Sequence, residues 1–314
     1  MRQRSASGLR TIGLLAAASG AALFLAFTAP SSAQQNQQKG GQAPNPAVDL
    51  NSGFEIGPNG GVAQKGKGKG KQKGPSAPTP HWPDGRVNLG PLPGQKGMWE
   101  GNAGATLATN PPGGLDNPSM YLPTNIKIED VPWQPWAKAV YEFRQATTTK
   151  DDPHVRCKPS GGSRMFHTPY GSEIIDVPAE KRMYIMGVGG PHTWRTVYMD
   201  GRTHPKDLDP SFSGHAIGHW EGETLVVDTV GFNEKFWLTR EGIPSTSALH
   251  LIEKFTRTDY DTMKYEVTID DPGAYTRPWT GGWYLRWQTG EEMYEYICQE
   301  NNRDVEHMFG GARN

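Results

Sequence analysis

The chain of 314 residues has only two cysteines, and after its first 33 residues it has no apolar run long enough to span a bilayer. A membrane-spanning helix needs about 18 or more apolar residues, so we expect a protein that does not span the membrane. A Gly-x-Ser-x-Gly turn is absent and the glycines around Gly187 lack dinucleotide-loop spacing, which disfavours serine hydrolysis and hydride transfer. With 35% hydrophobic residues, 39 Gly and 26 Pro, the composition excludes a coiled coil or a helical bundle.

Residues 1–33 have the three parts of a secretory signal peptide. Arginines at positions 2, 4 and 10 precede an apolar stretch over residues 12–27, and small residues follow at 31–33. This pattern predicts export, and therefore a mature protein that is periplasmic or secreted.

Residues 34–80 contain ten Gly and six Pro, with Phe54 as the sole aromatic residue. Such a segment buries too little apolar surface to offset the entropy of chain ordering, so we expect a disordered linker. Its lysines alternate with glycine from Lys65 to Lys71. This basic stretch is either a solubilising spacer or a weak attachment to an anionic envelope surface.

Residues 81–314 are expected to form a single β-rich domain, and all nine His and ten Trp lie there. This part carries 23 Lys and Arg against 31 Asp and Glu, a net charge of −8. A folded nucleic-acid-binding surface needs a basic face, so nucleic acid is not an expected partner.

Short apolar runs separated by turn residues predict an antiparallel lipocalin-like barrel or a sandwich. The predicted strands are 172–177, 181–188, 192–199, 214–220, 224–230, 249–257, 262–269, 281–288 and 292–298. One short helix is expected from Pro135, because apolar residues recur there at steps of three and four, and it should pack on the barrel or sheet. The residues of this apolar stripe are Trp136, Ala139, Val140 and Phe143.

The segment 214–230 is predicted to be a hairpin that turns at Glu221-Gly222-Glu223. With a three-residue loop, Trp220 lies opposite Thr224, and His215 shares a face with Leu225 and Val227. A loop shorter or longer by one residue would exchange these partners.

Four segments resemble a large family of secreted bacterial hypothetical proteins. They are Gly189-Gly-Pro-His-Thr-Trp-Arg195, Tyr198-Met-Asp-Gly-Arg-Thr-His-Pro205, Gly214-His-Ala-Ile-Gly-His-Trp-Glu-Gly-Glu-Thr-Leu-Val-Val-Asp-Thr-Val-Gly-Phe-Asn233 and Thr268-Ile-Asp-Asp-Pro-Gly-Ala-Tyr-Thr-Arg-Pro-Trp279. The resemblance runs from about Trp82 to the C-terminus and implies family membership without implying an activity. Relatives commonly read Pro-His-Thr-Glu where this chain reads Pro244-Ser-Thr-Ser247, so two polar groups of the family pattern are replaced.

The two cysteines, Cys157 and Cys298, are expected to form a disulfide, because export takes the chain into an oxidising compartment. A nucleophilic cysteine is the alternative, but the flanking residues of known catalytic cysteines are absent.

Histidines and carboxylates concentrate between residues 192 and 253, and this suggests a site for acid–base or metal-assisted chemistry. We expect the histidines to act as proton carriers or ligands of a divalent transition metal, with carboxylates orienting them. The candidate residues are His204, His215, His250, Asp228 and Glu253.

Each of these residues also has an ordinary structural interpretation. His215 and His250 lie among apolar residues, as buried and hydrogen-bonded core histidines do, and Glu253 can be the solvent-facing residue of an alternating strand. Asp228 ends an apolar run, so if buried it must be paired or hydrogen-bonded.

Trp194, Trp220 and Trp279 are candidate walls of an interior ligand pocket, although core packing explains them equally well. Two functions are therefore expected, and both have a small molecule as partner. The first is a secreted enzyme performing hydrolysis or elimination, and the alternative is a noncatalytic lipocalin-like protein that binds an apolar or aromatic ligand.

Overall fold

The computed structural model describes residues 76–101, 107–109, 122–147, 150–168 and 170–300, together with the backbone of two short strands nearer the N-terminus. These strands, β1 (Phe54–Ile56) and β2 (Val62–Gln64), form an antiparallel pair within the segment expected to be disordered. The chain divides into two units after Ser52, and every described residue belongs to the second unit. The predicted signal peptide and the lysine run at 65–71 lie outside the described residues.

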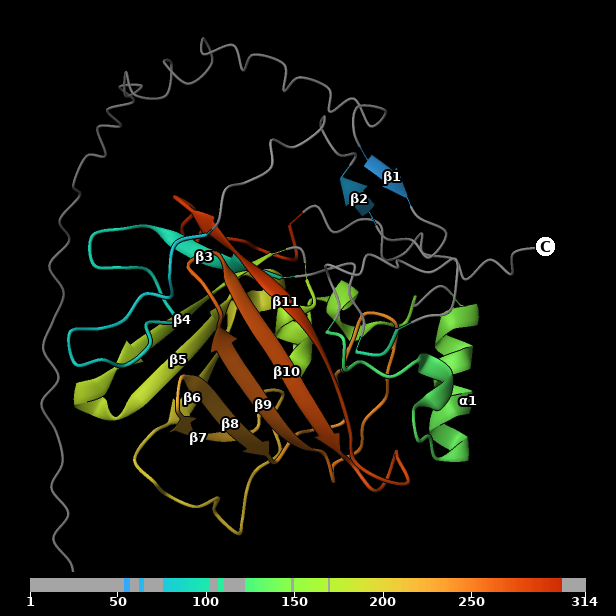
Figure 1. Cartoon of the computed structure of the whole chain (residues 1–314). Helices are drawn as coiled ribbons and strands as arrows, with labels where there is room; N and C mark the ends of the chain where they lie inside the picture. The colour runs from blue at the N-terminus through green and yellow to red at the C-terminus, as the bar shows by residue number, and fades with distance from the viewer. Residues whose placement is uncertain are drawn as a thin grey trace, which may run out of the picture. The chain divides into compact units, whose positions relative to one another are not determined.

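Nine strands in the described part of the chain close into one barrel, so that each is paired on both sides (Figure 1). They are β3 (Gly97–Glu100), β4 (Gly171–Val177), β5 (Arg182–Gly187), β6 (Thr193–Tyr198), β7 (His215–Glu221), β8 (Thr224–Val230), β9 (His250–Arg257), β10 (Thr262–Asp270) and β11 (Trp279–Thr289). Their order around the barrel is β10-β11-β3-β4-β5-β6-β7-β8-β9. The predicted mostly β fold is confirmed, and it is a barrel and not a sandwich.

One strand pairing differs from the expected antiparallel pattern. β6 and β7 are parallel, with Val197 opposite Ala216, because the connection over residues 199–214 returns the chain to the end at which β6 began. An odd number of strands cannot alternate in direction all the way around a closed barrel, so nine strands require a parallel pair. β6, β7, β9 and β11 therefore all begin at the same end of the barrel.

The predicted strands agree with the structure within two residues at each end, except for the last. The prediction of a strand at 292–298 is wrong, because this segment has no strand structure and most of its side chains are exposed. A closed barrel offers no free edge at which another strand could pair. β3 was not predicted, because it has only four residues and begins at a glycine, which is packed against the ring of Trp287.

Alternate residues of the strands point into the barrel, and aromatic side chains fill much of its interior. A short 3-10 helix, η3 (Gly162–Phe166), contributes to this core, and all five of its residues are buried. The ring of Phe166 lies 5.4 Å from that of Phe255 and 4.9 Å from that of Tyr265, whose ring is 5.2 Å from that of Trp283. The barrel axis is therefore occupied by side chains of the wall and of η3.

Arg257 is the last residue of β9 and closes one end of the barrel, the end away from the starts of β7 and β9. Its guanidinium lies 4.9 Å from the ring centres of both Trp99 and Trp287 and donates to the carbonyl oxygens of Asn88 and Gly90. Although a charged residue is costly to bury, these carbonyls and ring faces compensate the guanidinium.

The predicted helix is present as α1 (Pro135–Ala146) and lies outside the barrel wall (Figure 1), but its packed face differs from the predicted one. Ala137 is the wholly buried residue of the helix, and Tyr141 stacks on Trp133 at 5.2 Å. Trp136 and Phe143 are 45% and 59% exposed. The prediction that this apolar stripe is the packed face is therefore wrong. The indole of Trp136 is hydrogen-bonded at the surface, where its Nε1 donates to the carbonyl oxygen of Gly273.

Replacing Phe143 by serine should therefore change the free energy of unfolding by no more than about 0.5 kcal/mol, as exposed substitutions do. Replacing the neighbouring Tyr141 by serine should cost several times more, because Tyr141 packs against the core. Urea denaturation of both variants measures this difference. Equal losses would contradict the observed orientation of the helix.

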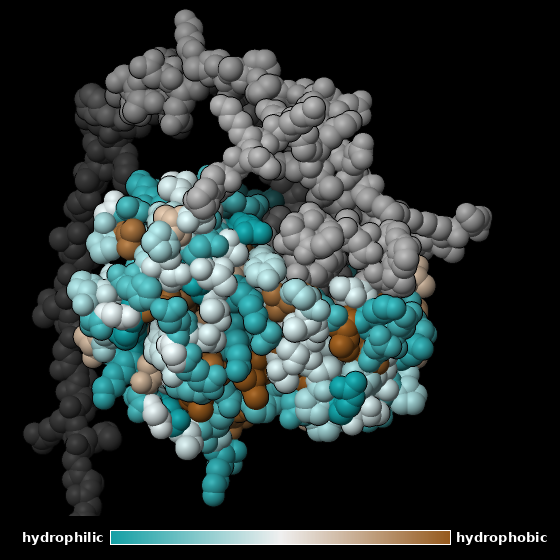
Figure 2. Space-filling model, in the orientation of Figure 1, coloured by the Kyte–Doolittle hydropathy of each residue, from teal (hydrophilic) through white to brown (hydrophobic). Residues whose placement is uncertain are grey.

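The remaining helices in the described residues are short. They are η1 (Ile128–Asp130), η2 (Pro153–Arg156), η4 (Pro178–Glu180) and the kinked turn α2 (Gly189–His192). None of the helices in the described ranges has the length and apolar character required to cross a bilayer. Figure 2 shows that hydrophilic and neutral residues cover most of the visible face of the described part, with apolar residues in small separate groups.

Candidate functional site

The β7–β8 hairpin has a two-residue loop, and this corrects the predicted register. Glu221 pairs with Thr224 and Trp220 with Leu225, so every partner is shifted by one residue from the three-residue-loop alternative. Gly222 adopts a φ of 59°, which suits a tight turn between paired strands. Since a shift by one residue exchanges the faces, Asp228 shares the outer face with His215 and not with Trp220.

Four predicted site residues meet on this outer face, and we call them the imidazole cluster: His204, His215, Asp228 and His250. Nδ1 of His204 lies 2.9 Å from Nδ1 of His215, and its Nε2 lies 3.1 Å from Oδ1 of Asp228. The same Oδ1 lies 2.7 Å from Nε2 of His250. His215 and His250 are the first residues of β7 and β9, Asp228 lies in β8, and His204 comes from the 199–214 connection.

The hydrogen bonds of the cluster determine where its protons lie. A carboxylate only accepts, so Nε2 of both His204 and His250 must donate to Asp228. In a neutral His204 the other nitrogen, Nδ1, is then an acceptor, and the proton it shares with His215 belongs to Nδ1 of His215. Lone pairs consequently remain on Nε2 of His215 and Nδ1 of His250.

The cluster is partly open to solvent. The side chains of His204, Asp228 and His250 are 20%, 32% and 32% exposed, and His215 is half-buried. Burial lowers the pKa of His215, and nearby His204 and Arg202 lower it further. His215 is therefore neutral at neutral pH, as a general base must be.

Side chains of the cluster bond to one another, and among the described residues no three His, Cys, Asp or Glu side chains are grouped as ligands of a metal ion. The tautomers required by these hydrogen bonds nevertheless leave two imidazole lone pairs on the outer face of β7–β9. What the described arrangement can do without further groups is accept and donate protons.

Glu253 does not belong to the cluster, and its expected solvent-facing position is wrong. It points into the barrel and is fully buried, with its carboxylate oxygens 2.5 and 3.1 Å from the guanidinium of Arg195, which is also buried. The hydroxyl of Tyr265 donates to the same carboxylate at 2.8 Å. Glu253 is thus the acceptor of an interior polar network.

The three predicted ligand-binding tryptophans do not form one wall. Trp194 is 62% exposed on the outer face near the start of β6, and Trp220 is half-buried near the end of β7. Trp279 is buried against Tyr275 at 5.5 Å, at the start of β11. Because β6 and β7 run parallel, Trp194 and Trp220 lie toward opposite ends of the barrel.

Two residues around the cluster were missed as site residues, although both belong to a segment noted in the sequence. The ring of Tyr198 stacks on that of His215 at 5.2 Å, and the guanidinium of Arg202 lies 3.9 Å from the Tyr198 ring centre. The interior Arg195 was missed as well. Tyr198, Arg202 and His204 lie close together in the sequence, and this spacing could have marked the first two as site residues. The contacts around His215 could not be predicted, because these depend on how β6 pairs with β7.

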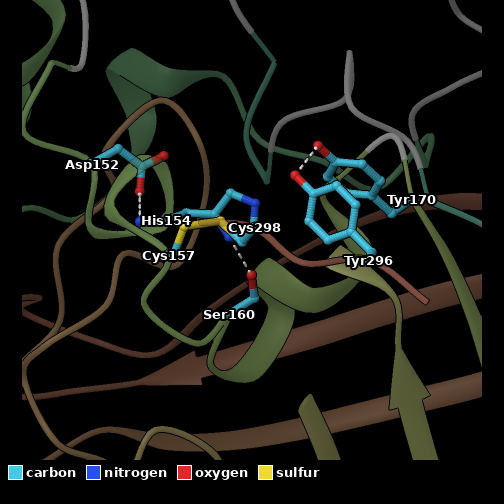
Figure 3. The surroundings of a disulfide bond; sticks show 7 residues. All are labelled: Asp152, His154, Cys157, Ser160, Tyr170, Tyr296 and Cys298. Atoms are coloured by element: carbon cyan, nitrogen blue, oxygen red, sulfur yellow. Dashed lines mark hydrogen bonds between the residues drawn. A yellow bond between two sulfur atoms is a disulfide. The ribbon is translucent and has the colours of Figure 1, made fainter. Parts of the chain in front are cut away.

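The predicted disulfide between Cys157 and Cys298 is present, with a Cα–Cα distance of 5.6 Å (Figure 3). It joins the residue after η2 to the segment that follows β11, 141 residues later. Nearby, Nδ1 of His154 lies 2.9 Å from Oγ of Ser160, and burial lowers the pKa of His154 to about 4. Figure 3 also shows the hydroxyls of Tyr170 and Tyr296 facing each other, at a distance of 3.0 Å.

A pocket of about 330 Å³ lies beside the disulfide. Its lining residues are Cys157, Pro191, Glu295, Tyr296, Ile297, Cys298 and Gln299. No residue of the imidazole cluster lines this pocket, and the two cysteines are the predicted site residues among those that do.

Comparison with protein-family models, with curated proteins and with solved structures finds no match to this chain. The resemblance to secreted bacterial hypothetical proteins therefore stays a prediction. Function has to be argued from the chemistry of the site itself.

Proposed function

We propose that this protein is an extracytoplasmic enzyme that performs general acid–base chemistry, hydrolysis or elimination, on a small molecule at the imidazole cluster. The observation that carries the proposal is the continuous hydrogen-bond chain from His215 through His204 to Asp228 and on to His250. It connects two imidazoles with lone pairs to one shared carboxylate on a partly exposed surface.

The shared carboxylate suits a pair of groups with opposite roles. When Nε2 of His215 takes a proton from water or from a substrate carbon, Nδ1 of His215 can pass its own proton to His204, which lies beside Asp228. A protonated His250 can give a proton to a leaving group, since Asp228 stabilises its imidazolium at 2.7 Å. One carboxylate stabilises one imidazolium better than two, which favours one acid and one base at a time.

The outer wall is a better place for a substrate than the interior. The rings of Phe166, Phe255 and Tyr265 are in mutual contact inside the barrel, and Arg195 and Glu253 are already paired with each other there. We therefore do not propose the alternative function of binding a ligand within the barrel.

The proposed location rests on the disulfide. A bond between Cys157 and Cys298 is compatible with a periplasmic or secreted protein, because disulfides persist in oxidising compartments. The predicted signal peptide agrees with export.

Two simple probes test the chemistry. Nitrobenzisoxazole opens when a base removes a carbon-bound proton, and p-nitrophenyl acetate reports hydrolysis. We expect saturable turnover of at least one probe, with kcat reduced about 100-fold or more in Asp228→Asn and in His215→Gln, as loss of a general base requires. Removal of metals with EDTA should leave the rate unchanged.

His219→Gln is the matched control, because His219 lies on the same face of β7 as His215, is 61% exposed and bonds to Glu221 outside the cluster. This variant should keep the full rate. The proposal is overturned if His219→Gln loses as much activity as His215→Gln, or if neither probe reacts faster than with an equal concentration of free imidazole. Activity that EDTA abolishes and zinc restores would instead make the cluster a set of metal ligands.

A further inference from the structure

The loop that carries His204 is folded back on itself by an Asp-Gly-Arg turn. The backbone N–H of Arg202 donates to Oδ1 of Asp200 at 3.2 Å, and its guanidinium donates to both carboxylate oxygens at 2.6 to 3.0 Å. Gly201, between them, has a φ of 75°, a conformation that favours glycine. The turn fixes the direction in which the guanidinium of Arg202 extends.

The ring of Tyr198 contacts both that guanidinium and the imidazole of His215. The guanidinium is 3.9 Å from the ring centre of Tyr198, and the Tyr198 ring is nearly parallel to that of His215, at 5.2 Å and 24°. His204, two residues after Arg202, returns to His215 with its ring at 75° and 5.1 Å between centres. Two residues of this segment, Tyr198 and His204, thus contact His215 directly, and Arg202 lies against Tyr198.

We propose that Arg202 is a positioning residue, which together with Asp200 and Tyr198 holds His204 and His215 in the orientation that lets a proton pass between their Nδ1 atoms. This inference rests on the proposed function. Four side chains of the segment 198–204 are connected in this way: Asp200 bonds to Arg202, Arg202 lies on the ring of Tyr198, and both Tyr198 and His204 contact His215. The lowering of the His215 pKa by Arg202, after burial and His204, agrees with this proximity.

Lysine should not substitute for this arginine. A guanidinium is planar, stacks on an aromatic face and bonds a carboxylate with two parallel N–H groups, whereas an ammonium group does neither. The arrangement therefore predicts that Arg202→Lys behaves like Arg202→Gln.

The chain contains a matched control in a second Asp-Gly-Arg turn. At residues 84–86 the backbone N–H of Arg86 donates to Asp84 at 3.1 Å, its Nε donates at 2.8 Å, and Gly85 has a φ of 87°. Arg86 is 35% exposed and Arg202 39% exposed, but Arg86 pairs with Asp176 of β4 and not with an aromatic ring beside the cluster. Arg86→Gln removes the equivalent guanidinium–carboxylate contact and leaves His204 and His215 untouched.

The experiment reads the tautomers of the imidazoles directly, by long-range proton–nitrogen NMR of protein labelled with nitrogen-15 in histidine. At about pH 8, above the usual histidine pKa, wild type should show His215 protonated at Nδ1 and His204 at Nε2. In Arg202→Gln and Arg202→Lys the Nδ1–H form of His215 should be lost or averaged. For whichever probe the wild type turns over, kcat should fall about 10-fold or more while KM changes little. Arg86→Gln should match wild type in both readouts.

A second variant, Tyr198→Leu, removes the aromatic platform but keeps the Asp200–Arg202 pair, so it tests the same idea if Arg202→Gln folds poorly. An unchanged His215 tautomer in folded Arg202→Gln and Tyr198→Leu would overturn the positioning role, while leaving the proposed enzyme intact if wild type turns over the probe. Conversely, a wild type with the expected tautomers but without turnover would defeat the proposed function and leave the positioning role standing.

Discussion

Replacing Glu253 by glutamine should lower the free energy of unfolding by about 3 to 5 kcal/mol, the usual loss when one partner of a buried ion pair is removed. Arg195 is 1% exposed and has its guanidinium 2.5 Å from Glu253, so the glutamine variant leaves a buried positive charge without a compensating carboxylate. Tyr265 would also lose its carboxylate acceptor, which now lies 2.8 Å away. Urea denaturation at neutral pH measures the loss.

A double replacement shows how much the intact pair contributes to the free energy of unfolding, apart from the cost of leaving one buried charge alone. Arg195→Met with Glu253→Leu puts apolar side chains of similar size into the interior, and such replacements of buried pairs are often neutral or stabilising. The double variant should therefore be clearly more stable than Glu253→Gln alone. Adding Tyr265→Phe should not lower its stability further, because the hydroxyl no longer has a carboxylate to bond.

Glu221→Gln serves as the exposed control. Glu221 pairs with Lys254, the residue after Glu253, and both side chains of this pair are at least 40% exposed. Exposed pairs contribute at most about 1 kcal/mol. If Glu253→Gln were as stable as Glu221→Gln but had lost turnover of nitrobenzisoxazole, Glu253 would belong to the reaction and not to the interior network.

Glu253 also shows which part of the fold could not be predicted from the sequence. The alternation in β9 is visible in the sequence, and its boundaries were predicted to within one residue. The positions of its charged residues were not predicted. Glu253 and Arg257 lie on the same inward face as Leu251 and Phe255, where only apolar residues are expected. The partner that makes burial of Glu253 tolerable is Arg195, 58 residues earlier, and no local pattern reveals such a pairing.

The candidate site was likewise predicted in composition but not in geometry. Residue chemistry was enough to single out His204, His215, Asp228 and His250. Their meeting depends on the two-residue loop at Gly222, since one more loop residue would have moved His215 and Asp228 to opposite faces. It depends also on the parallel β6–β7 pair, whose long connection brings His204 back beside His215.

Replacing Glu241 by glutamine should stabilise the protein by about 3 kcal/mol at pH 8 and leave its stability unchanged near pH 4. Burial raises the pKa of Glu241 to about 7 from its usual value of 4.5, and its Oε2 is buried without a hydrogen-bond partner. Its other oxygen lies 3.6 Å from Nε2 of the fully buried His167. Glutamine resembles the protonated acid, so it removes the cost of ionisation in this environment.

The direction of the effect follows from the raised pKa. A folded protein that holds Glu241 protonated is stabilised below pH 4.5, and this contribution disappears as the pH rises through about 7. His154 acts in the opposite direction, because its pKa is lowered to about 4 from 6.5 by burial and then by Arg164. Its contribution is complete above pH 6.5 and is lost as the pH falls toward 4.

Between about pH 4.5 and 6.5 the two contributions have opposite slopes and similar size, so they should largely cancel in the wild type. Glu241→Gln should therefore become more stable as the pH rises over this range, whereas His154→Asn, which keeps an acceptor for Ser160, should become less stable. Urea denaturation at intervals of pH, with each variant compared with wild type at the same pH, isolates these two groups from all others that titrate. Parallel curves for Glu241→Gln and wild type would mean that Glu241 is ionised at the same pH in the folded and unfolded chain, and that burial does not control its charge.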